Sequence, residues 1–173
     1  MTPVITDNFL DHYPFQHLQN VMFGDDFNWF YSDGIDIEEE ESGGKGDKFQ
    51  FFHSFYNPDV GVNSYQFEEL NSILNKIQPK EIFKIKANLL TRTSEIVKNT
   101  FHVDIEDFST NKLPWKTGIL YMNTNDGYTE FENGTVVESV ANRMVMFPTE
   151  MKHRGTSCTN EKIRVVINFN FQP

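Results

Sequence analysis

The chain has 173 residues and is acidic, with 25 Asp and Glu against 15 Lys and Arg and a formal net charge of −10. This charge argues against nucleic acid as a partner, because binding to the phosphate backbone requires clustered Lys and Arg. Hydrophobic residues make up 38% of the chain, and 17 residues are Phe. This is enough apolar material for a packed core, so we expect one folded domain over residues 1–173.

The cysteine count and the hydropathy of the chain indicate where in the cell the protein is expected. The single cysteine, Cys158, excludes an internal disulfide and fits a reducing environment. The sequence has neither an apolar run of roughly 18 residues nor a basic-then-apolar start. We therefore expect no membrane partner and a cytoplasmic location.

Residues 1–80 are expected to form helices and strands that support the rest of the domain. Apolar residues at helical spacing follow Pro14 and stop at Gly24. A second helical stripe follows Asn63, which is placed to form a capping box with Gln66. Aromatic runs predict strands at 27–31 and 49–56.

Residues 33–48 are acidic, rich in glycine and low in complexity. This composition predicts a flexible, solvated loop rather than packed structure. A second interpretation is a mobile lid over the site, because lids are drawn from the least stable segments. The acidity of such a lid would favour a cationic substrate.

From residue 81 onward, the pattern changes to short strands separated by turns. Asp126-Gly127 and Asn133-Gly134 are strong turn signals that bracket one strand. A polar loop at 107–114 is a natural place for substrate contacts. Helices followed by about eight short strands indicate a β-sandwich or barrel with helices packed on one side. The other predicted strands are 82–90, 99–106, 115–122, 135–140, 143–147, one at His153, and 163–171.

Two potential metal ligands share a face of the predicted strand 99–106. His102 and Asp104 are two positions apart, so their side chains point the same way, about 7 Å apart along the strand. His153 is the candidate for a third ligand. Two His and one carboxylate are the ligand set of non-heme Fe(II) oxygenases. A His-x-Asp pair alone has low specificity, and its other interpretation is the polar face of a surface strand.

The last predicted strand, 163–171, alternates strictly. Its apolar residues share one face, whereas Arg164, Val166, Asn168 and Asn170 share the other. A buried Arg164 must find an anion, and its planar guanidinium suits two-point contact with a carboxylate. That carboxylate belongs either to a ligand or to an Asp or Glu of the chain itself.

These residues resemble the 2-oxoglutarate/Fe(II)-dependent dioxygenases, in particular the compact prolyl-hydroxylase-like group that includes small phage and marine bacterial forms. The resemblance rests on His102-x-Asp104, His153 and Arg164 with their spacing, and on Tyr121-Met122-Asn123, which resembles a Tyr-Leu-Asn segment of the family. Residues 127–131 resemble the glycine-rich, Phe-ended hairpin of the family. The resemblance covers 82–171 well and the first 80 residues only loosely.

The resemblance implies a double-stranded β-helix, a jelly-roll variant, with its core at 81–171 and the N-terminal helices packed on one face. It implies that Fe(II) binds His102, Asp104 and His153. It also implies that the far carboxylate of 2-oxoglutarate pairs with Arg164 and Tyr121. The implied reaction consumes O2, converts 2-oxoglutarate to succinate and CO2, and hydroxylates a C–H bond, with ascorbate as a supporting reductant.

The sequence departs from the family in the predicted pocket. Many relatives carry a further Tyr on the strand before the His-x-Asp pair, and Asn88 is the candidate for its polar role here. Asn168 and Asn170 stand where relatives often have Thr or Trp, and they line the predicted pocket together with Thr129 and Arg154. Each of these is equally an ordinary polar residue of a strand. The departures leave the substrate open among peptidyl proline, free amino acids and other small metabolites.

Two other functions fit parts of the pattern. Two His and one Asp also suit a hydrolytic zinc site, although Arg164 has the spacing that a dicarboxylate cosubstrate needs. A non-catalytic jelly-roll binding module is the second alternative, and the intact set of three ligands argues against it.

Overall fold

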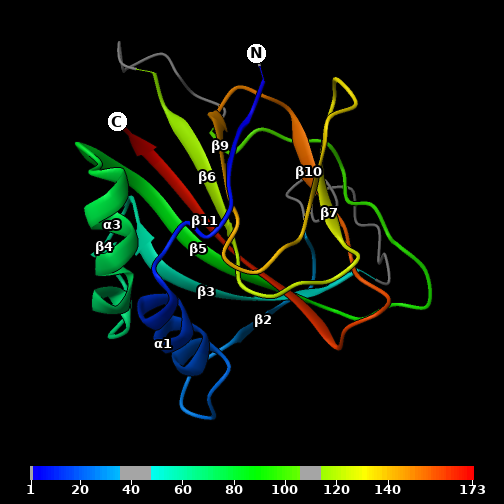
Figure 1. Ribbon diagram of the computed structural model, residues 1–173, viewed down its shortest axis with the longest axis horizontal. Helices are drawn as coiled ribbons and strands as arrows, with labels where there is room; N and C mark the ends of the chain where they lie inside the picture. Colours follow the sequence, from blue (N-terminus) through cyan, green and yellow to red (C-terminus); the bar gives the residue numbers. More distant parts are fainter. Residues whose placement is uncertain (1, 36–47, 106–113) are drawn as a thin grey trace.

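The computed structural model describes residues 2–35, 48–105 and 114–173 (Figure 1). The predicted acidic loop at 33–48 and the polar loop at 107–114 fall mainly outside these ranges. None of the described helices is long and apolar enough to cross a membrane.

The described chain is dominated by two antiparallel sheets. The large sheet has the order β1-β9-β6-β11-β5-β3-β2, with β4 paired to β3, and the small sheet has the order β10-β7-β8. This arrangement confirms the predicted mostly-β jelly-roll class. The strands are β1 (Val4–Thr6), β2 (Phe30–Ser32), β3 (Gln50–Asn57), β4 (Gly61–Val62), β5 (Glu81–Thr91), β6 (Lys116–Tyr121), β7 (Tyr128–Phe131), β8 (Val136–Glu138), β9 (Met144–Pro148), β10 (His153–Gly155) and β11 (Ile163–Gln172).

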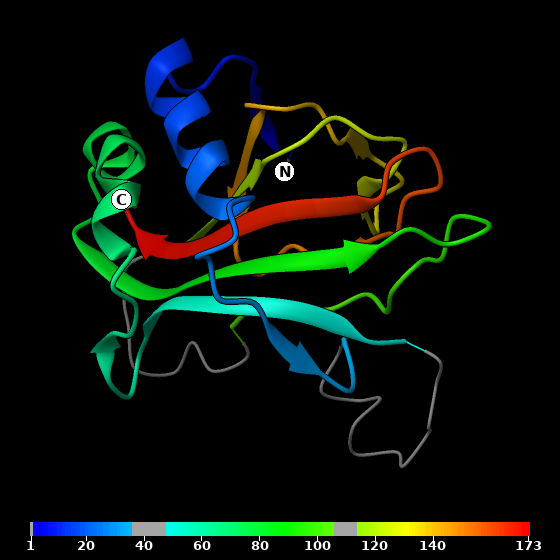
Figure 2. The same ribbon diagram turned by 90° about the horizontal axis from the view of Figure 1, so that it is seen from below.

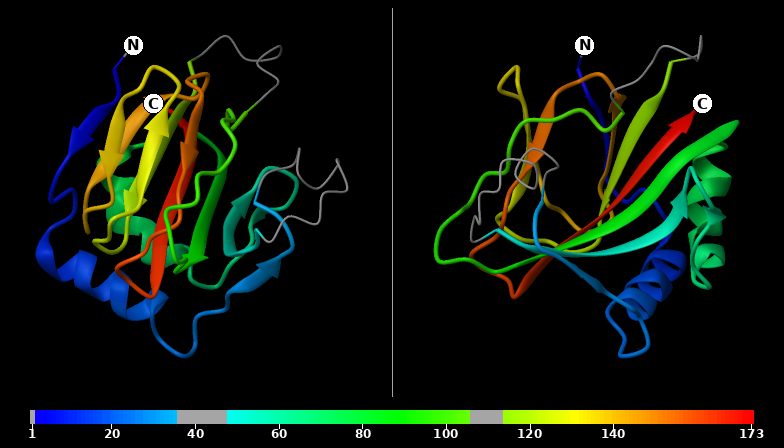
Figure 3. Two further views of the ribbon diagram at one scale, coloured as in Figure 1. Left: turned by 90° about the vertical axis from the view of Figure 1, so that its right-hand side faces the viewer. Right: turned by 180° about the vertical axis from the view of Figure 1, so that it is seen from behind.

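The helices cover one face of the large sheet, as the sequence predicts, and the small sheet lies on the opposite side (Figure 3). In α1 (His12–Met22), the buried residues Phe15, Leu18 and Met22 recur at helical spacing. The 3-10 helix η1 (Phe67–Leu70) and α3 (Asn71–Ile77) add further buried side chains. Together with apolar residues of β11, β5 and β3, which run side by side in Figure 2, these side chains form the main core.

The predicted start of the second helix is wrong. The chain is still extended at Asn63, whose backbone N–H donates to the Phe55 carbonyl at 2.9 Å, and neither η1 nor α3 has a side-chain cap. Ser64 takes the local role expected of Asn63, because its hydroxyl accepts a hydrogen bond from the Gln66 backbone N–H at 3.0 Å. The same hydroxyl contacts His53 Nε2 at 2.7 Å, which ties the turn to β3.

The alternation predicted for 163–171 is confirmed in β11. Val165, Ile167, Phe169 and Phe171 enter the core beneath the helices. The opposite face, which carries Arg164 and Asn170, looks between the two sheets. A second apolar cluster fills part of that space. The members of this second cluster are Ile119, Tyr121, Phe131, Val137, Val145, Phe147 and Val166. The polar residues of β11 therefore lie beside an apolar layer, inside the jelly roll.

Candidate metal centre and anion pocket

His102 and His153 are held side by side by backbone hydrogen bonds of an isolated bridge, not by a pair of extended strands. The prediction of a strand at 99–106 is wrong for the described part of that segment, because His102 forms only an isolated antiparallel bridge, with His153 at the start of β10. The bridge has both of its hydrogen bonds, since each residue donates its N–H to the carbonyl of the other at 3.0 Å. The bridge therefore fixes the two side chains beside each other, with ring centroids 4.8 Å apart.

Both imidazoles are oriented by a backbone carbonyl two residues earlier. His102 Nδ1 contacts the Thr100 carbonyl at 3.1 Å, and His153 Nδ1 contacts the Met151 carbonyl at 3.1 Å. Because a carbonyl can only accept, the proton of each neutral ring belongs on Nδ1. Nε2 then carries the lone pair, and in both residues Nε2 is the atom that approaches Asp104. This is the tautomer that a metal-ligating histidine requires.

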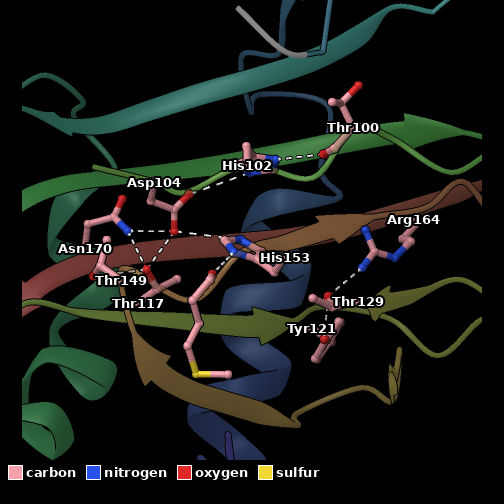
Figure 4. A network of polar contacts seen from close by, with 11 residues as sticks. Thr100, His102, Asp104, Thr117, Tyr121, Thr129, Thr149, His153, Arg164 and Asn170 are labelled. Carbon is pink, nitrogen blue, oxygen red and sulfur yellow. Dashed lines mark hydrogen bonds and ion pairs between the residues drawn. The ribbon is translucent and has the colours of Figure 1, made fainter. Parts of the chain in front are cut away.

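Asp104 completes the cluster (Figure 4). Its Oδ1 lies 3.9 Å from His102 Nε2, and its Oδ2 lies 3.8 Å from His153 Nε2. Burial alone would raise the pKa of the carboxyl, but His153 and a hydrogen bond from Thr117 outweigh it, and the pKa lies below its ordinary value of 3.8. One ligand atom from each of the three residues falls within 4.8 Å of the others. The structure thus brings together the three ligands predicted from the sequence.

A cavity of about 400 Å³ adjoins the cluster. His102, Asp104 and His153 line it together with Arg164 and Thr129. The metal-ligand cluster and the predicted anion-binding residue therefore open into one space, although 60 residues separate Asp104 from Arg164 in the sequence.

Arg164 is buried, with 4% of its surface exposed. Its Nε donates to the Ser139 hydroxyl at 2.9 Å, and its Nη2 lies 3.4 Å from the Thr129 hydroxyl. Across the described ranges, no Asp or Glu forms a salt bridge with it. Burial lowers the pKa of the guanidinium, because desolvation disfavours the charged form. Arg164 is therefore a buried cation whose protein contacts are neutral.

Tyr121 lies behind Arg164 rather than in the cavity wall. The centre of the Arg164 guanidinium is 5.7 Å from the Tyr121 ring centroid. The Tyr121 hydroxyl is fully buried and donates to Thr129 Oγ1 at 2.8 Å. In this structure, the link from Tyr121 to the cavity therefore runs through Thr129, which does line it.

Two glycines make room for the Arg164 side chain. A Cβ on Gly127 would lie 2.6 Å from Arg164 Cδ and 2.6 Å from the Ser157 carbonyl oxygen. A Cβ on Gly155, which lines the cavity, would lie 3.4 Å from Arg164 Nη1. Gly127 belongs to a predicted turn, but its position against Arg164 depends on contacts between distant segments.

The other predicted pocket residues divide into three groups. Asn88 and Asn168 line the cavity, and the Oδ1 atom of each is buried without a hydrogen-bond partner in the described structure. Asn170 is fully buried and donates to Asp104, not to the cavity. Arg154 points elsewhere, donating to Glu130 at 2.9 Å and covering the Phe101 ring at 4.1 Å.

Glu130 anchors the strand pair that carries His153. Hydrogen bonds from Lys98 and Arg154 hold the pKa of the Glu130 carboxyl below its ordinary value of 4.5. Arg154 and Glu130 are also register partners in the β10–β7 pair. The prediction that Arg154 lines the pocket is therefore wrong, because Arg154 ties the two strands together on the face away from the cavity.

Sequence reasoning missed several residues that shape the site, among them Thr117, Ser139 and Gly155. Thr117 lies on β6, where it is the register partner of Asn170 on β11. Ser139 follows β8 and reaches Arg164 from the small sheet's side. No short motif marks these positions. Only the pairing of the strands brings them to the ligands.

No protein-family model and no curated protein sequence matches the chain. Solved structures match it over nearly its whole length. A Pseudomonas putida prolyl-4-hydroxylase has a TM-score of 0.61 at 12% identity, covering 98% of this chain and 91% of its own. A viral collagen prolyl hydroxylase from Paramecium Bursaria Chlorella virus-1, in complex with 2-oxoglutarate, has a TM-score of 0.55 at 14% identity, with coverages of 99% and 96%.

A third similar structure has a different activity. The non-heme α-ketoglutarate-dependent epimerase SnoN from nogalamycin biosynthesis has a TM-score of 0.63 at 11% identity, covering 98% of this chain and 76% of its own. Hydroxylases and an epimerase therefore share this architecture, and at such low identity the likeness establishes the fold alone. The chain has the jelly-roll fold of these prolyl hydroxylases and of this α-ketoglutarate-dependent epimerase.

Proposed function

We propose that this chain is an Fe(II)- and 2-oxoglutarate-dependent oxygenase that hydroxylates a C–H bond of a peptide or small-molecule substrate. Arg164 carries the proposal. A buried guanidinium without a carboxylate partner is costly, by several kcal/mol, unless an anion compensates it. It shares one cavity with a two-His, one-Asp cluster. A dicarboxylate of the right length would bind the metal at one end and pair with the Arg164 guanidinium at the other.

The donor set fits Fe(II). Two imidazole nitrogens and one carboxylate oxygen are the facial set found in non-heme Fe(II) oxygenases, and a facial set leaves open positions. The tautomers fixed by the Thr100 and Met151 carbonyls direct both Nε2 atoms inward. The carboxyl of Asp104, with its lowered pKa, is ionised at neutral pH, as a ligand must be.

The cavity fits 2-oxoglutarate. Its volume of about 400 Å³ lies within the range of small-molecule sites. Arg164 offers two-point contact to a carboxylate, and the Thr129 hydroxyl stands beside it. In the cavity wall, the buried amide oxygens of Asn88 and Asn168 also have no hydrogen-bond partner in the described structure. Because amide oxygen and nitrogen can exchange places by rotation, each side chain can offer a donor or an acceptor to a polar ligand.

The bound metal with 2-oxoglutarate and O2 supplies the oxidising power, giving succinate, CO2 and a hydroxylated product. The chain's own contribution is positioning. His102, Asp104 and His153 hold the metal from one side. Arg164 binds the far carboxylate of the cosubstrate and so fixes its direction in the cavity. Val166 and Ile119 form an apolar stretch of wall that limits water near the reacting groups.

The class of substrate is proposed from the similar structures. Two of the similar structures are prolyl hydroxylases, and this favours a peptidyl proline or an amino acid as the substrate of this chain.

The first experiment measures succinate formation from 2-oxoglutarate by the purified protein with Fe(II), O2 and ascorbate. We expect slow turnover that depends on iron and is lost in the His153→Ala variant. Arg143→Met is the matched control, because Arg143 is paired with Asp7 away from the cavity. A thermal-shift titration with Mn(II) and 2-oxoglutarate measures binding independently of turnover. The proposal fails if the protein neither forms succinate nor binds 2-oxoglutarate, and a zinc site or a binding module then becomes the better explanation.

A further inference from the structure

Two lysines of β5 line the same cavity as the metal-ligand cluster. Every second residue in this part of β5 belongs to the cavity wall, in the order Lys84, Lys86, Asn88 and Leu90. The residues between them are part of the core beneath the helices. The alternation of side chains along the strand therefore directs both lysines, which are partly buried, toward the cavity.

The register between β5 and β11, which run side by side in Figure 2, separates Lys84 from Arg164. Lys84 is the register partner of Asn170, whose amide donates to Asp104 Oδ2 at 3.0 Å. Leu90, six positions further along β5, is the partner of Arg164. Six positions correspond to about 20 Å along a strand. Lys84 therefore lies at the Asp104 end of the cavity wall, and Arg164 lies at the opposite end.

Lys84 lacks a carboxylate partner in the described part of the chain. It forms no salt bridge there. The only carboxylate among the described lining residues is that of Asp104, which belongs to the metal-ligand cluster. Lys86 has a different environment, because its Nζ lies over the Phe52 ring, 4.9 Å from the centroid.

The charges of the loaded site also favour a second anion. A divalent metal ion and the dianion of 2-oxoglutarate offset each other, and the Asp104 carboxylate offsets the Arg164 guanidinium. The positive charge of Lys84 is then offset by no described lining residue, and it stands at the same end as a metal of the same sign. A partly buried charge of this kind is stabilised by a nearby opposite charge. The far carboxylate of 2-oxoglutarate cannot supply that charge, since it is held at the Arg164 end.

We propose that Lys84 binds the carboxylate of a small substrate, a free amino acid, while Arg164 binds that of the cosubstrate. This inference rests on the proposed function. The reacting C–H bond must face the metal, and Lys84 is one register position from a residue that contacts a metal ligand. The carboxylate and the C–H bond therefore belong to one small molecule, a few bonds apart. A proline inside a peptide offers no charge to Lys84.

Asn168 offers a group that complements the other end of an amino acid. It lies on β11 as the register partner of Lys86 and lines the cavity. Its Oδ1 is buried and has no hydrogen-bond partner in the described structure. Native proteins satisfy most buried polar atoms, so this acceptor favours a donor from the ligand. The ammonium group of a free amino acid supplies a donor next to the carboxylate, which distinguishes it from other small acids.

The test compares two pools of ligands on protein saturated with Mn(II) and 2-oxoglutarate. One pool contains the common amino acids as free acids. The other contains the same amino acids as α-amides, which keep the ammonium group and lack the carboxylate. Binding is measured by thermal shift, and succinate formation is measured in parallel with Fe(II) in place of Mn(II).

Three variants accompany the wild type. Lys84→Met removes the charge and keeps an unbranched side chain, whereas Lys84→Arg keeps the charge. Lys80→Met is the matched control, because Lys80 is an exposed lysine just before β5 and does not line the cavity. If Lys84→Met does not fold, Lys84→Gln takes its place.

We expect the free acids to stabilise the loaded wild type and to increase succinate formation, and the amides to do neither. In Lys84→Met, the free-acid concentration at half of the shift should rise by about 10-fold. This is the lower end of the effect of a hydrogen bond to a charged group, because solvent screens a partly buried lysine. Lys84→Arg and Lys80→Met should stay close to the wild type.

Three results would overturn the inference. If the amides bind as well as the acids or better, the substrate is neutral or cationic, as a lid formed by the acidic residues 33–48 would favour. If Lys84→Met raises the 2-oxoglutarate midpoint instead, Lys84 belongs to the cosubstrate. If neither pool binds, the substrate is not a free amino acid. Failure of the proposed function is distinct, because the wild type would then fail to bind 2-oxoglutarate before either pool is added.

Discussion

Replacing Arg164 by Met should weaken the binding of 2-oxoglutarate without destabilising the ligand-free protein. Met removes the charge and keeps an unbranched side chain of similar length. Arg164 is 4% exposed, and its protein contacts are the hydroxyls of Ser139 and Thr129. A hydrogen bond to a charged group contributes about 1.5–3 kcal/mol. At about 1.4 kcal/mol per factor of ten, the affinity for 2-oxoglutarate should fall by about 10- to 150-fold.

The empty protein should not be destabilised in the same way. Replacement of a buried charge by an apolar side chain of similar volume is often neutral or stabilising. Burial lowers the pKa of Arg164, because desolvation disfavours the charged form. We therefore expect the ligand-free variant to melt at the wild-type temperature or up to about 4 °C higher, since 1 kcal/mol corresponds to about 2–4 °C in a domain of this size.

Both effects can be measured in one thermal-shift series in which 2-oxoglutarate is titrated with Mn(II) present. Arg143→Met serves as the control and should leave the titration midpoint unchanged, because Arg143 pairs with Asp7 outside the cavity. An unaltered midpoint in Arg164→Met would refute the assignment of Arg164 to the far carboxylate. A large fall in the melting temperature of the ligand-free variant would show instead that Arg164 is a structural group.

Three further predictions concern the neighbourhood of the site. His153→Ala should abolish metal binding, measured by Mn(II) titration, while the circular dichroism spectrum stays that of a folded β protein; tight binding would contradict the ligand assignment. Gly127→Ala should lower stability by about 1–3 kcal/mol in urea denaturation, because its Cβ would lie 2.6 Å from Arg164 Cδ. Gly155→Ala, with its nearest contact at 3.4 Å, should cost less, and equal losses would refute this steric argument. The Glu130 carboxyl has a lowered pKa in the folded protein, so its contribution to stability is present above about pH 4.5 and is lost as the pH falls through the folded value. The difference in melting temperature between wild type and Glu130→Gln should therefore shrink on acidification, and a constant difference would contradict it.

The alternation of side chains along a strand explains which residues of the site could be predicted from the sequence. In β11, every second residue faces the space between the sheets, and this rule placed Arg164 and Asn168 correctly at the cavity. The same rule, applied to β10, would have excluded Arg154. His153 and Gly155 face the cavity, so the residue between them must face away.

The register between strands accounts for what was missed. Thr117 and Asn170 are 53 positions apart, and only the pairing of β6 with β11 brings them together. A slip of one residue would turn one of the two away from Asp104. A single sequence carries no short-range signal for that pairing. The His-x-Asp segment shows a related limit, since its ligands meet without the extended strand that the spacing suggested.

The reciprocal backbone bridge between His102 and His153 has a consequence for handling the protein. Two main-chain hydrogen bonds set the spacing of the imidazoles, and neither depends on an ion. Folding should therefore precede metal loading, in contrast to small domains that fold only around their metal. A preformed pair of imidazoles accepts several divalent ions, and those late in the first transition row bind more tightly than Fe(II). The identity of the metal in a purified sample will therefore depend on the metal ions present during growth and purification. A chelator should remove the metal without unfolding the chain.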